Sequence, residues 1–295
     1  MFAAAVMAAC TFCAQVPGYM ANPFNLSTDQ LRVKAQQLRG DILTMLTEAK
    51  SGHPGGSLSA IDIVTALYYR VMNHDPKNPS LPNRDRFLLS KGHACPALYA
   101  TLADCGYFPK EWLKGLRKLG GHLEGHPSRL DTPGIEMSAG PLGQGLAVGN
   151  GMALAGRLDK MDHRVFVMIG CGESQEGEIW EAAMAAPHYK LGHVVAIQDY
   201  NGLQIDGTND CVMCLGDMAA KWMAFGWETI EIDGHDMDEI VDVLSRVGLH
   251  DDAPPTMIVA HTVKGKGVTF MENKVEWHGT APSTDDLAKA LAELA

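Results

Sequence analysis

The fold is decided by residues 169–202, IGCGESQEGEIWEAAMAAPHYKLGHVVAIQDYNG. This stretch reads as the end of a strand, a glycine turn, a helix, a second strand and a second turn. The first turn, Gly170–Gly172, has the build of a loop that binds an anion through backbone N–H groups. Cys171 stands in the centre of this loop, where a hard cation would need a carboxylate ligand. The sequence therefore raises the question of what the loop binds.

The same alternation of short apolar runs and helices continues on both sides of this stretch. Val- and Ile-rich runs separated by helices are typical of a parallel sheet that is covered on both faces. We therefore predict an α/β fold with a doubly wound, mostly parallel sheet and helices on both faces. The predicted strands are 86–90, 164–169, 193–198, 227–232 and 255–262, and the predicted helices lie within 30–49, 61–71, 91–106, 140–158 and 177–191 and from 237 onward.

The composition limits the classes of function. The net charge of -11 argues against a broad nucleic-acid-binding surface or an anionic-membrane surface, because both need positive charge. It does not exclude an anionic small molecule held by backbone N–H groups and a few histidines. The seven cysteines are odd in number and have no small-domain spacing, which predicts a reducing, cytoplasmic location without a disulfide framework.

The N-terminal segment is the one ambiguous part of the chain. Residues 2–14 are apolar enough for the core of a signal peptide, but no Lys or Arg precedes them, and the run is too short to span a bilayer. We interpret residues 1–21 as a disordered or mis-annotated extension, with a signal peptide as the alternative. Residues 22–295 contain no linker or internal repeat and are predicted to form a single domain.

Candidate ligand-binding residues follow four of the predicted strands. They are His93, Cys171, Asn201 and the KGKG turn that starts at Lys264. Sheets of this class bind ligands at the carboxyl ends of their strands. An asparagine oxygen and a backbone carbonyl are hard donors suited to Mg²⁺ or Ca²⁺. The pattern fits a site for a metal and a diphosphate, but it also fits an ordinary pair of turns, because Asn-Gly and Gly-x-Gly are common turn sequences.

Further motifs favour the first interpretation. Residues 169–202 resemble the thiamine-diphosphate signature, G-D-G-x-x-x-E-G followed by an asparagine turn. Taken in order, all the motifs resemble the N-terminal, diphosphate-binding half of transketolase, from about Leu31 to the C-terminus. Because a whole transketolase also has a C-terminal half, the chain looks like the free-standing N-terminal subunit of a split transketolase. The other motifs are SGHPGGSLSAIDI (51–63), DRFLLSKGHACPALYA (85–100), EGHPSR (124–129), GPLGQG (140–145), DGHD (233–236), TVKGKG (262–267) and EWHG (276–279).

The resemblance implies roles for particular residues. It implies thiamine diphosphate as the cofactor, held with Mg²⁺ or with Mn²⁺ or Ca²⁺. His53, His126 and His278 are the implied catalytic residues, which line the substrate channel and bind the hydroxyls of a sugar phosphate. The implied cofactor-binding residues are His93, Gly140, Pro141, Leu142, Gly172, Glu176, Asn201 and His278, and the implied metal-binding positions are Cys171, Asn201 and Leu203.

Within the implied cofactor-binding residues, Leu142 is expected to pack on the aminopyrimidine and Glu176 to reach a partner at the subunit interface. Plain packing of Leu142 and plain solvation of Glu176 are the alternatives. Lys264 and Lys266 receive no role, because a solvated turn accounts for them.

Two features depart from the family pattern. Cys171 replaces the aspartate that ligates Mg²⁺ in the family, which removes a charged oxygen ligand from the site. Pro187 lies within a predicted helix, where an interior proline costs about 3 kcal/mol or kinks the helix. Together they indicate an altered metal site or relaxed function. Cys211 and Cys214 have zinc-ligand spacing, but no second pair of ligands accompanies them in the sequence.

The implied function is thiamine-diphosphate-dependent transfer of a two-carbon ketol unit between sugar phosphates. Activity is expected only with a C-terminal partner subunit, in a heterotetramer, and no nucleic-acid or membrane partner is expected. The alternatives are a subunit of a related ketose-phosphate synthase and a non-catalytic cofactor-binding partner with an impaired metal site. Which sugars react does not follow from the sequence, because their phosphate end is expected to contact the other subunit.

Overall fold

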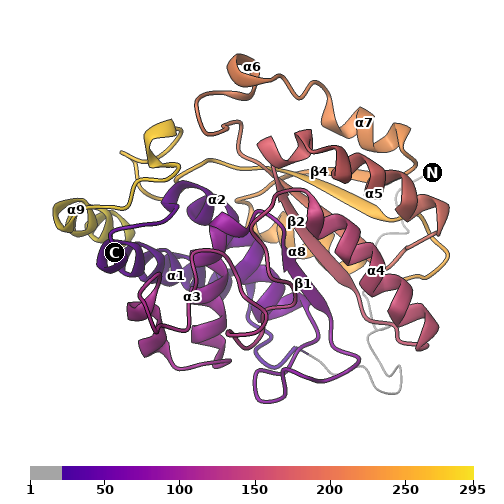
Figure 1. Ribbon diagram of the computed structural model, residues 1–295, viewed down its shortest axis with the longest axis horizontal. Coiled ribbons are helices and arrows are strands. Elements are labelled where there is room, and N and C mark those ends of the chain that lie inside the picture. The colour runs from indigo at the N-terminus through magenta and orange to yellow at the C-terminus, as the bar shows by residue number, and fades with distance from the viewer. Residues whose placement is uncertain (1–21) are drawn as a thin grey trace, which may run out of the picture.

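Five parallel strands form one sheet in the computed structural model, which describes residues 22–295 (Figure 1). All four neighbouring pairs of strands are parallel. The five predicted strands are confirmed. Four of them are largely buried, as apolar runs in such a sheet are, whereas the strand over 228–233 is mostly exposed or half-buried. Across the sheet the order is β1 (Arg86–Leu89), β2 (Val165–Gly170), β3 (Val194–Tyr200), β5 (Thr256–His261) and β4 (Glu228–Asp233).

Helices cover both faces of the sheet, as predicted for a doubly wound fold. Side chains of β2 alternate between the two layers: Phe166 and Met168 join one apolar cluster, while Val165 and Val167 join the other. The first cluster packs under α1 (Thr28–Ala49), α2 (Pro54–Ala66), α3 (Cys95–Cys105), α8 (Met237–Arg246) and α9 (Thr284–Leu294); the second packs under α4 (Gln144–Leu158), α5 (Gly177–His188) and α7 (Met218–Ala224).

Short helical segments complete the architecture. A π-helical turn at Leu67–Val71 continues α2, and α6 (Asn209–Val212) lies between β3 and α7. The 3₁₀ turns are Gly92–Ala94, Lys110–Gly115, Gly172–Gln175 and Val275–Trp277. Within residues 22–295 no helix combines the length and apolar character needed to cross a membrane. The interpretation of residues 1–21 lies outside the described residues, and the single domain over 22–295 stays a prediction.

The predicted start of the second helix is wrong. We expected a turn through residue 57 and a helix over 61–71, but α2 begins at Pro54, directly after His53. Proline suits the first position of a helix because it lacks only an N–H that would be unpaired there. Gly55 lies in the helix and not in a turn, and it is needed for close packing, because a Cβ atom at this position would lie 2.9 Å from the Lys264 side chain. This glycine therefore lets the start of α2 approach the turn after β5.

Pro187 lies in the last turn of α5 and breaks no local rule in this setting. A proline leaves the carbonyl four residues earlier without its helical donor. Here that carbonyl, of Ala183, accepts a hydrogen bond of 2.8 Å from the indole N–H of Trp227. The proline is compensated by a tertiary contact, so it gives no indication of relaxed function.

Replacing Trp227 with Phe should lower the free energy of unfolding by about 1–3 kcal/mol, because the buried Ala183 carbonyl loses its donor. Adding Pro187→Ala should restore part of this loss, since the new backbone N–H can donate to the same carbonyl. Urea unfolding of the two single variants and the double variant measures the coupling between the positions. Strictly additive effects would contradict this account of Pro187.

Candidate functional site

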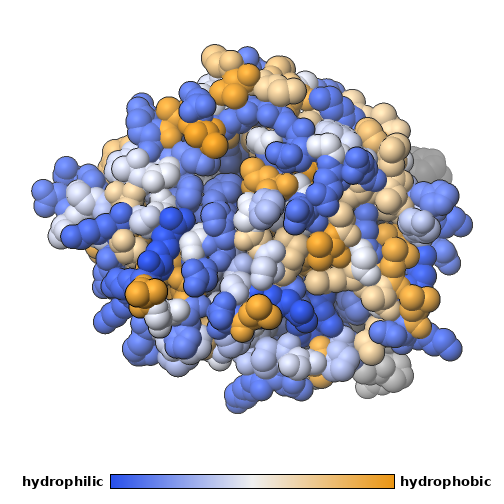
Figure 2. All heavy atoms as spheres, viewed as in Figure 1, coloured by the Kyte–Doolittle hydropathy of each residue, from blue (hydrophilic) through white to orange (hydrophobic). Residues whose placement is uncertain are grey.

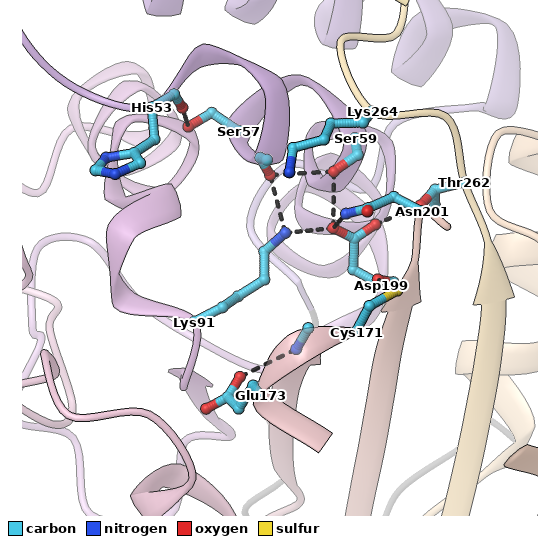
Figure 3. Close-up of polar contacts among 12 residues, drawn as sticks. His53, Ser57, Ser59, Lys91, Cys171, Glu173, Asp199, Asn201, Thr262 and Lys264 are labelled. Atoms are coloured by element: carbon cyan, nitrogen blue, oxygen red, sulfur yellow. Dashed lines mark hydrogen bonds and ion pairs between the residues drawn. The ribbon is translucent and has the colours of Figure 1, made fainter. Parts of the chain in front are cut away.

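The four expected positions converge at one edge of the sheet. Strands β1, β2, β3 and β5 are consecutive neighbours, so the residues that follow them lie side by side. These residues are His93, Cys171, Asn201 and Lys264, and Figure 3 shows the last three around the side chain of Asp199. The structure thus brings the four strand ends together, as expected, and their joint role as one site stays a prediction.

Three of the predicted histidines form a cluster over this edge. The ring centroids of His53, His93 and His278 lie 5.2 to 5.3 Å from one another. Burial lowers the pKa of His53 to about 4 and of His278 to about 3, and it lowers the pKa of His93 well below its usual value. The three imidazoles are therefore neutral near pH 7, where each ring can donate one hydrogen bond and accept another.

His126 lies at the outer side of this cluster. Its side chain is exposed, and partial burial together with the Arg117 guanidinium lowers its pKa. It is close enough to His53 to contribute to the low pKa of that ring, after burial and Arg117. All four predicted histidines thus face one region, with His126 nearest to solvent.

Lys264 is buried in the same region, which corrects our interpretation of it as a solvated residue. Its side chain is 2% exposed, and its Nζ donates to His278 Nδ1 at 2.8 Å. Burial, followed by repulsion from Lys91, lowers its pKa to about 8. Within residues 22–295 no carboxylate lies within ion-pair distance of Lys264. The Asp199 carboxylate attracts Lys264 from farther away but is already paired with Lys91, so the two buried lysines outnumber this carboxylate and favour binding of an anion.

A buried ion pair that the sequence did not predict lies next to Asn201 and the start of α2. The ammonium of Lys91 contacts the carboxylate of Asp199 and donates to the Gly56 carbonyl at 2.9 Å. Asp199 also accepts from the Ser59 hydroxyl at 2.7 Å and from Asn201 Nδ2 at 3.0 Å. Burial opposes ionisation of Asp199, but Lys91 and the hydrogen bonds from the Thr262 and Ser59 hydroxyls outweigh it and lower its pKa. This network orients Asn201 and links it to the start of α2 (Figure 3).

Cys171 is a buried, neutral thiol in this environment. Its side chain is 2% exposed, burial raises its pKa, and its Sγ lies 3.7 Å from the backbone carbonyl oxygen of Asp199. The thiol lies beside the Asn201 turn, and hydrogen bonds from the backbone of Asn201 and Gly202 partly offset the rise in its pKa. A protonated thiol supplies neither the charge nor the oxygen that Mg²⁺ prefers.

The remaining donors at the predicted metal position are neutral. Asn201 Oδ1 accepts from the Leu203 N–H at 3.2 Å, and the Leu203 carbonyl belongs to the same turn. Within residues 22–295 no group of three His, Cys, Asp or Glu side chains is placed to hold a metal ion. The site therefore fits a diphosphate, through Lys264, the histidine cluster and the glycine loop, but it fits a hard divalent cation poorly.

The predicted residues before α4 adjoin the glycine loop. The N–H of Gly143, in the turn that includes Gly140 and Leu142, donates to the Glu173 carboxylate at 2.9 Å. A Cβ atom on Gly143 would lie 2.8 Å from Glu176 Cβ, so the two turns are in close contact. Leu142 is half-buried, whereas Pro141 and Glu176 are exposed. These positions suit contacts with a ligand or partner, which stay predictions.

Comparisons with known proteins bear out the resemblance. The family model described as "Transketolase, thiamine diphosphate binding domain" matches residues 31–294. The chain is 40% identical to one of the subunits of the apulose-4-phosphate transketolase of Phocaeicola vulgatus, covering 91% of this chain and 95% of that protein. It is 44% identical to 6-deoxy-6-sulfo-D-fructose transketolase subunit SqwG of a Clostridium species, covering 90% of this chain and 96% of that protein.

Solved structures agree with this assignment. The transketolase of Campylobacter jejuni superposes with a TM-score of 0.85 at 33% identity, covering 91% of this chain and 43% of that one. The chain thus spans less than half the length of this solved transketolase, but nearly the full length of the two subunits above. The chain belongs to the transketolase family, and it corresponds to the family's thiamine-diphosphate-binding domain.

Proposed function

We propose that this chain is the N-terminal, cofactor-binding subunit of a split transketolase that transfers a two-carbon ketol unit between sugar phosphates. The observation that carries the proposal is the buried Lys264 cation, which has no carboxylate partner within residues 22–295 and lies beside three neutral histidines. The similarity in length to proteins named as transketolase subunits supports it. The two names refer to ketoses that carry a phosphate or a sulfonate, so we propose an anionic ketose as the substrate class.

The residues of this chain have distinct tasks in the proposed reaction. Lys264, His93 and the Gly172 N–H hold the diphosphate of thiamine diphosphate, and Gly140, Pro141 and Leu142 support its aminopyrimidine. Bound thiamine diphosphate supplies the centre that stabilises a carbanion. His53, His126 and His278 bind substrate hydroxyls and move protons at those oxygens; a neutral imidazole does so by accepting a proton on its bare ring nitrogen and releasing the proton of its other nitrogen. Asn201 and the Leu203 carbonyl would hold a divalent ion weakly, since Cys171 adds no charge.

A partner subunit is part of this proposal. The residues expected to activate the aminopyrimidine belong to the C-terminal half of a transketolase, which this chain does not match. Apolar residues gather over α6 at the top of the molecule (Figure 2), where Val212 is 45% exposed and Met213 is 58% exposed. Together with exposed Glu176, they offer a surface for the partner in a heterotetramer of two copies of each chain. A cytoplasmic location stays a prediction from the cysteine content.

A non-catalytic, cofactor-binding role is the second candidate, and Cys171 is the observation that favours it. A buried neutral thiol in place of a charged ligand weakens the hold on a metal. A subunit of a related ketose-phosphate synthase would use the same site on a different sugar.

The test is reconstitution with a C-terminal transketolase subunit from the same organism. We expect no ketol transfer by either purified chain alone, turnover by the mixture, and light scattering that corresponds to two copies of each. Turnover by this chain alone would refute the need for a partner. A complex that binds thiamine diphosphate but transfers no ketol unit from phosphorylated or sulfonated ketoses would favour the non-catalytic role.

A further inference from the structure

Glu173 is a buried carboxylate to which the sequence assigned no role. It has no ion-pair partner within residues 22–295. It is 2% exposed and lies in the 3₁₀ turn directly after the glycine loop. Its Oε1 accepts from the Gly143 N–H at 2.9 Å and from the Ser90 hydroxyl, and its Oε2 accepts from the Gly170 N–H at 3.0 Å. One side chain therefore joins three segments that are distant in the sequence.

The directions of these hydrogen bonds can be assigned. Ser90 Oγ accepts from the Gly145 N–H at 3.1 Å, which leaves its own hydrogen to donate to Glu173. Both backbone N–H groups can only donate. All three contacts thus direct hydrogens at the two carboxylate oxygens. A side chain that carried a hydrogen at either oxygen position would fit less well, because that hydrogen would face another hydrogen.

The three segments are those that carry the expected cofactor contacts. Ser90 directly follows β1 and precedes the His93 turn, Gly143 ends the turn that begins at Gly140, and Gly170 begins the glycine loop. Their spacing is tight: a Cβ atom on Gly145 would lie 2.4 Å from Ser90 Oγ, and Gly143 has a φ of +94°. Small shifts of Glu173 would therefore be passed on to all three segments.

We propose that Glu173 is a positioning residue that holds these three segments at the spacing needed to bind a diphosphate cofactor. This inference rests on the proposed function for the identity of the ligand. It assigns a task to a residue for which the sequence offered no signal besides its place directly after the glycine loop.

Glu173→Gln tests the inference with almost no change in shape. The amide has one oxygen, so its NH₂ group must face either the Gly143 N–H or the Gly170 N–H. We expect the affinity of the assembled complex for thiamine diphosphate to fall about tenfold in calorimetric titration, with an unchanged number of sites. We also expect faster amide hydrogen exchange in residues 140–146 and 168–174 of the cofactor-free protein. Glu181→Gln, on the exposed side of α5, is the control with the same change in charge.

The possible outcomes separate the two proposals. Fewer sites at an unchanged affinity would mean that Glu173 only supports folding, and unchanged affinity and exchange would mean that it positions nothing; each result overturns the inference. If the unaltered complex binds no thiamine diphosphate, the proposed function fails, and the exchange rates still decide whether Glu173 orders the loops. If Glu173→Gln does not fold, Ser90→Ala removes the hydroxyl link alone and should speed exchange in residues 140–146; unchanged exchange there would overturn the inference.

Discussion

Replacing His53 with Ala in the assembled complex should lower the turnover number by about 10²–10⁴-fold, the usual contribution of a residue that moves a proton. The imidazole is held next to the start of α2, and burial keeps its pKa at about 4, so it is neutral at the pH of the reaction. The affinity for thiamine diphosphate should change much less, because Lys264 and the glycine loop remain in place. A loss in turnover without a matching loss in cofactor affinity is the mark of a residue that acts on the substrate.

His126→Ala and His278→Ala should behave in the same way, with a larger effect on cofactor affinity for His278 because it bonds to Lys264. His250→Ala, an exposed histidine outside the cluster, is the matched control. Steady-state kinetics and calorimetric titration of the cofactor measure the two quantities separately. Losses below about threefold at all three positions would return these histidines to a structural role.

The sequence predicted the sheet and the place of the site because both depend on local patterns. Apolar runs of strand length specified β1, β2, β3 and β5, and parallel topology then put the residues that follow these strands at one edge. The histidine cluster followed from the family motifs, which fix residues at strand and helix ends. These features need no knowledge of which distant residues touch.

The features that the sequence did not reveal depend on such distant contacts. Lys264 looked like a solvated turn residue, but Gly55 allows α2 to pack against it and bury it. Pro187 looked like a defect, because the indole of Trp227, which donates to the carbonyl that the proline leaves unpaired, comes from a distant part of the chain. No motif singled out Asp199 or Lys91, which lie 108 residues apart in the sequence and form a buried pair only in the folded chain. In each case a contact between distant parts of the chain decided the role of the residue.

Cys171→Asp should raise the Mg²⁺-dependent affinity for thiamine diphosphate by about 10–100-fold. Changes in groups that only support a metal ligand alter metal affinity by about this factor, and a direct ligand should matter at least as much. The thiol lies near the Asn201 turn and is protonated, so a carboxylate here would add the charged oxygen that Asn201 and the Leu203 carbonyl lack. In the unaltered complex Mn²⁺ should support cofactor binding better than Mg²⁺, because it tolerates softer ligands and binds more tightly at mixed sites.

Calorimetric titration of thiamine diphosphate into the assembled complex, with Mg²⁺, with Mn²⁺ and with a chelator, measures these affinities. Cys171→Asn is the control, because its side chain matches aspartate in shape but brings no charge, and it should gain little. Binding in the presence of the chelator should persist in the unaltered protein, since Lys264 can neutralise part of the diphosphate without a metal. If Cys171→Asp leaves the Mg²⁺-dependent affinity unchanged, Cys171 does not occupy the ligand position, and the loop at Gly170–Gly172 binds its anion through backbone N–H groups and lysine alone.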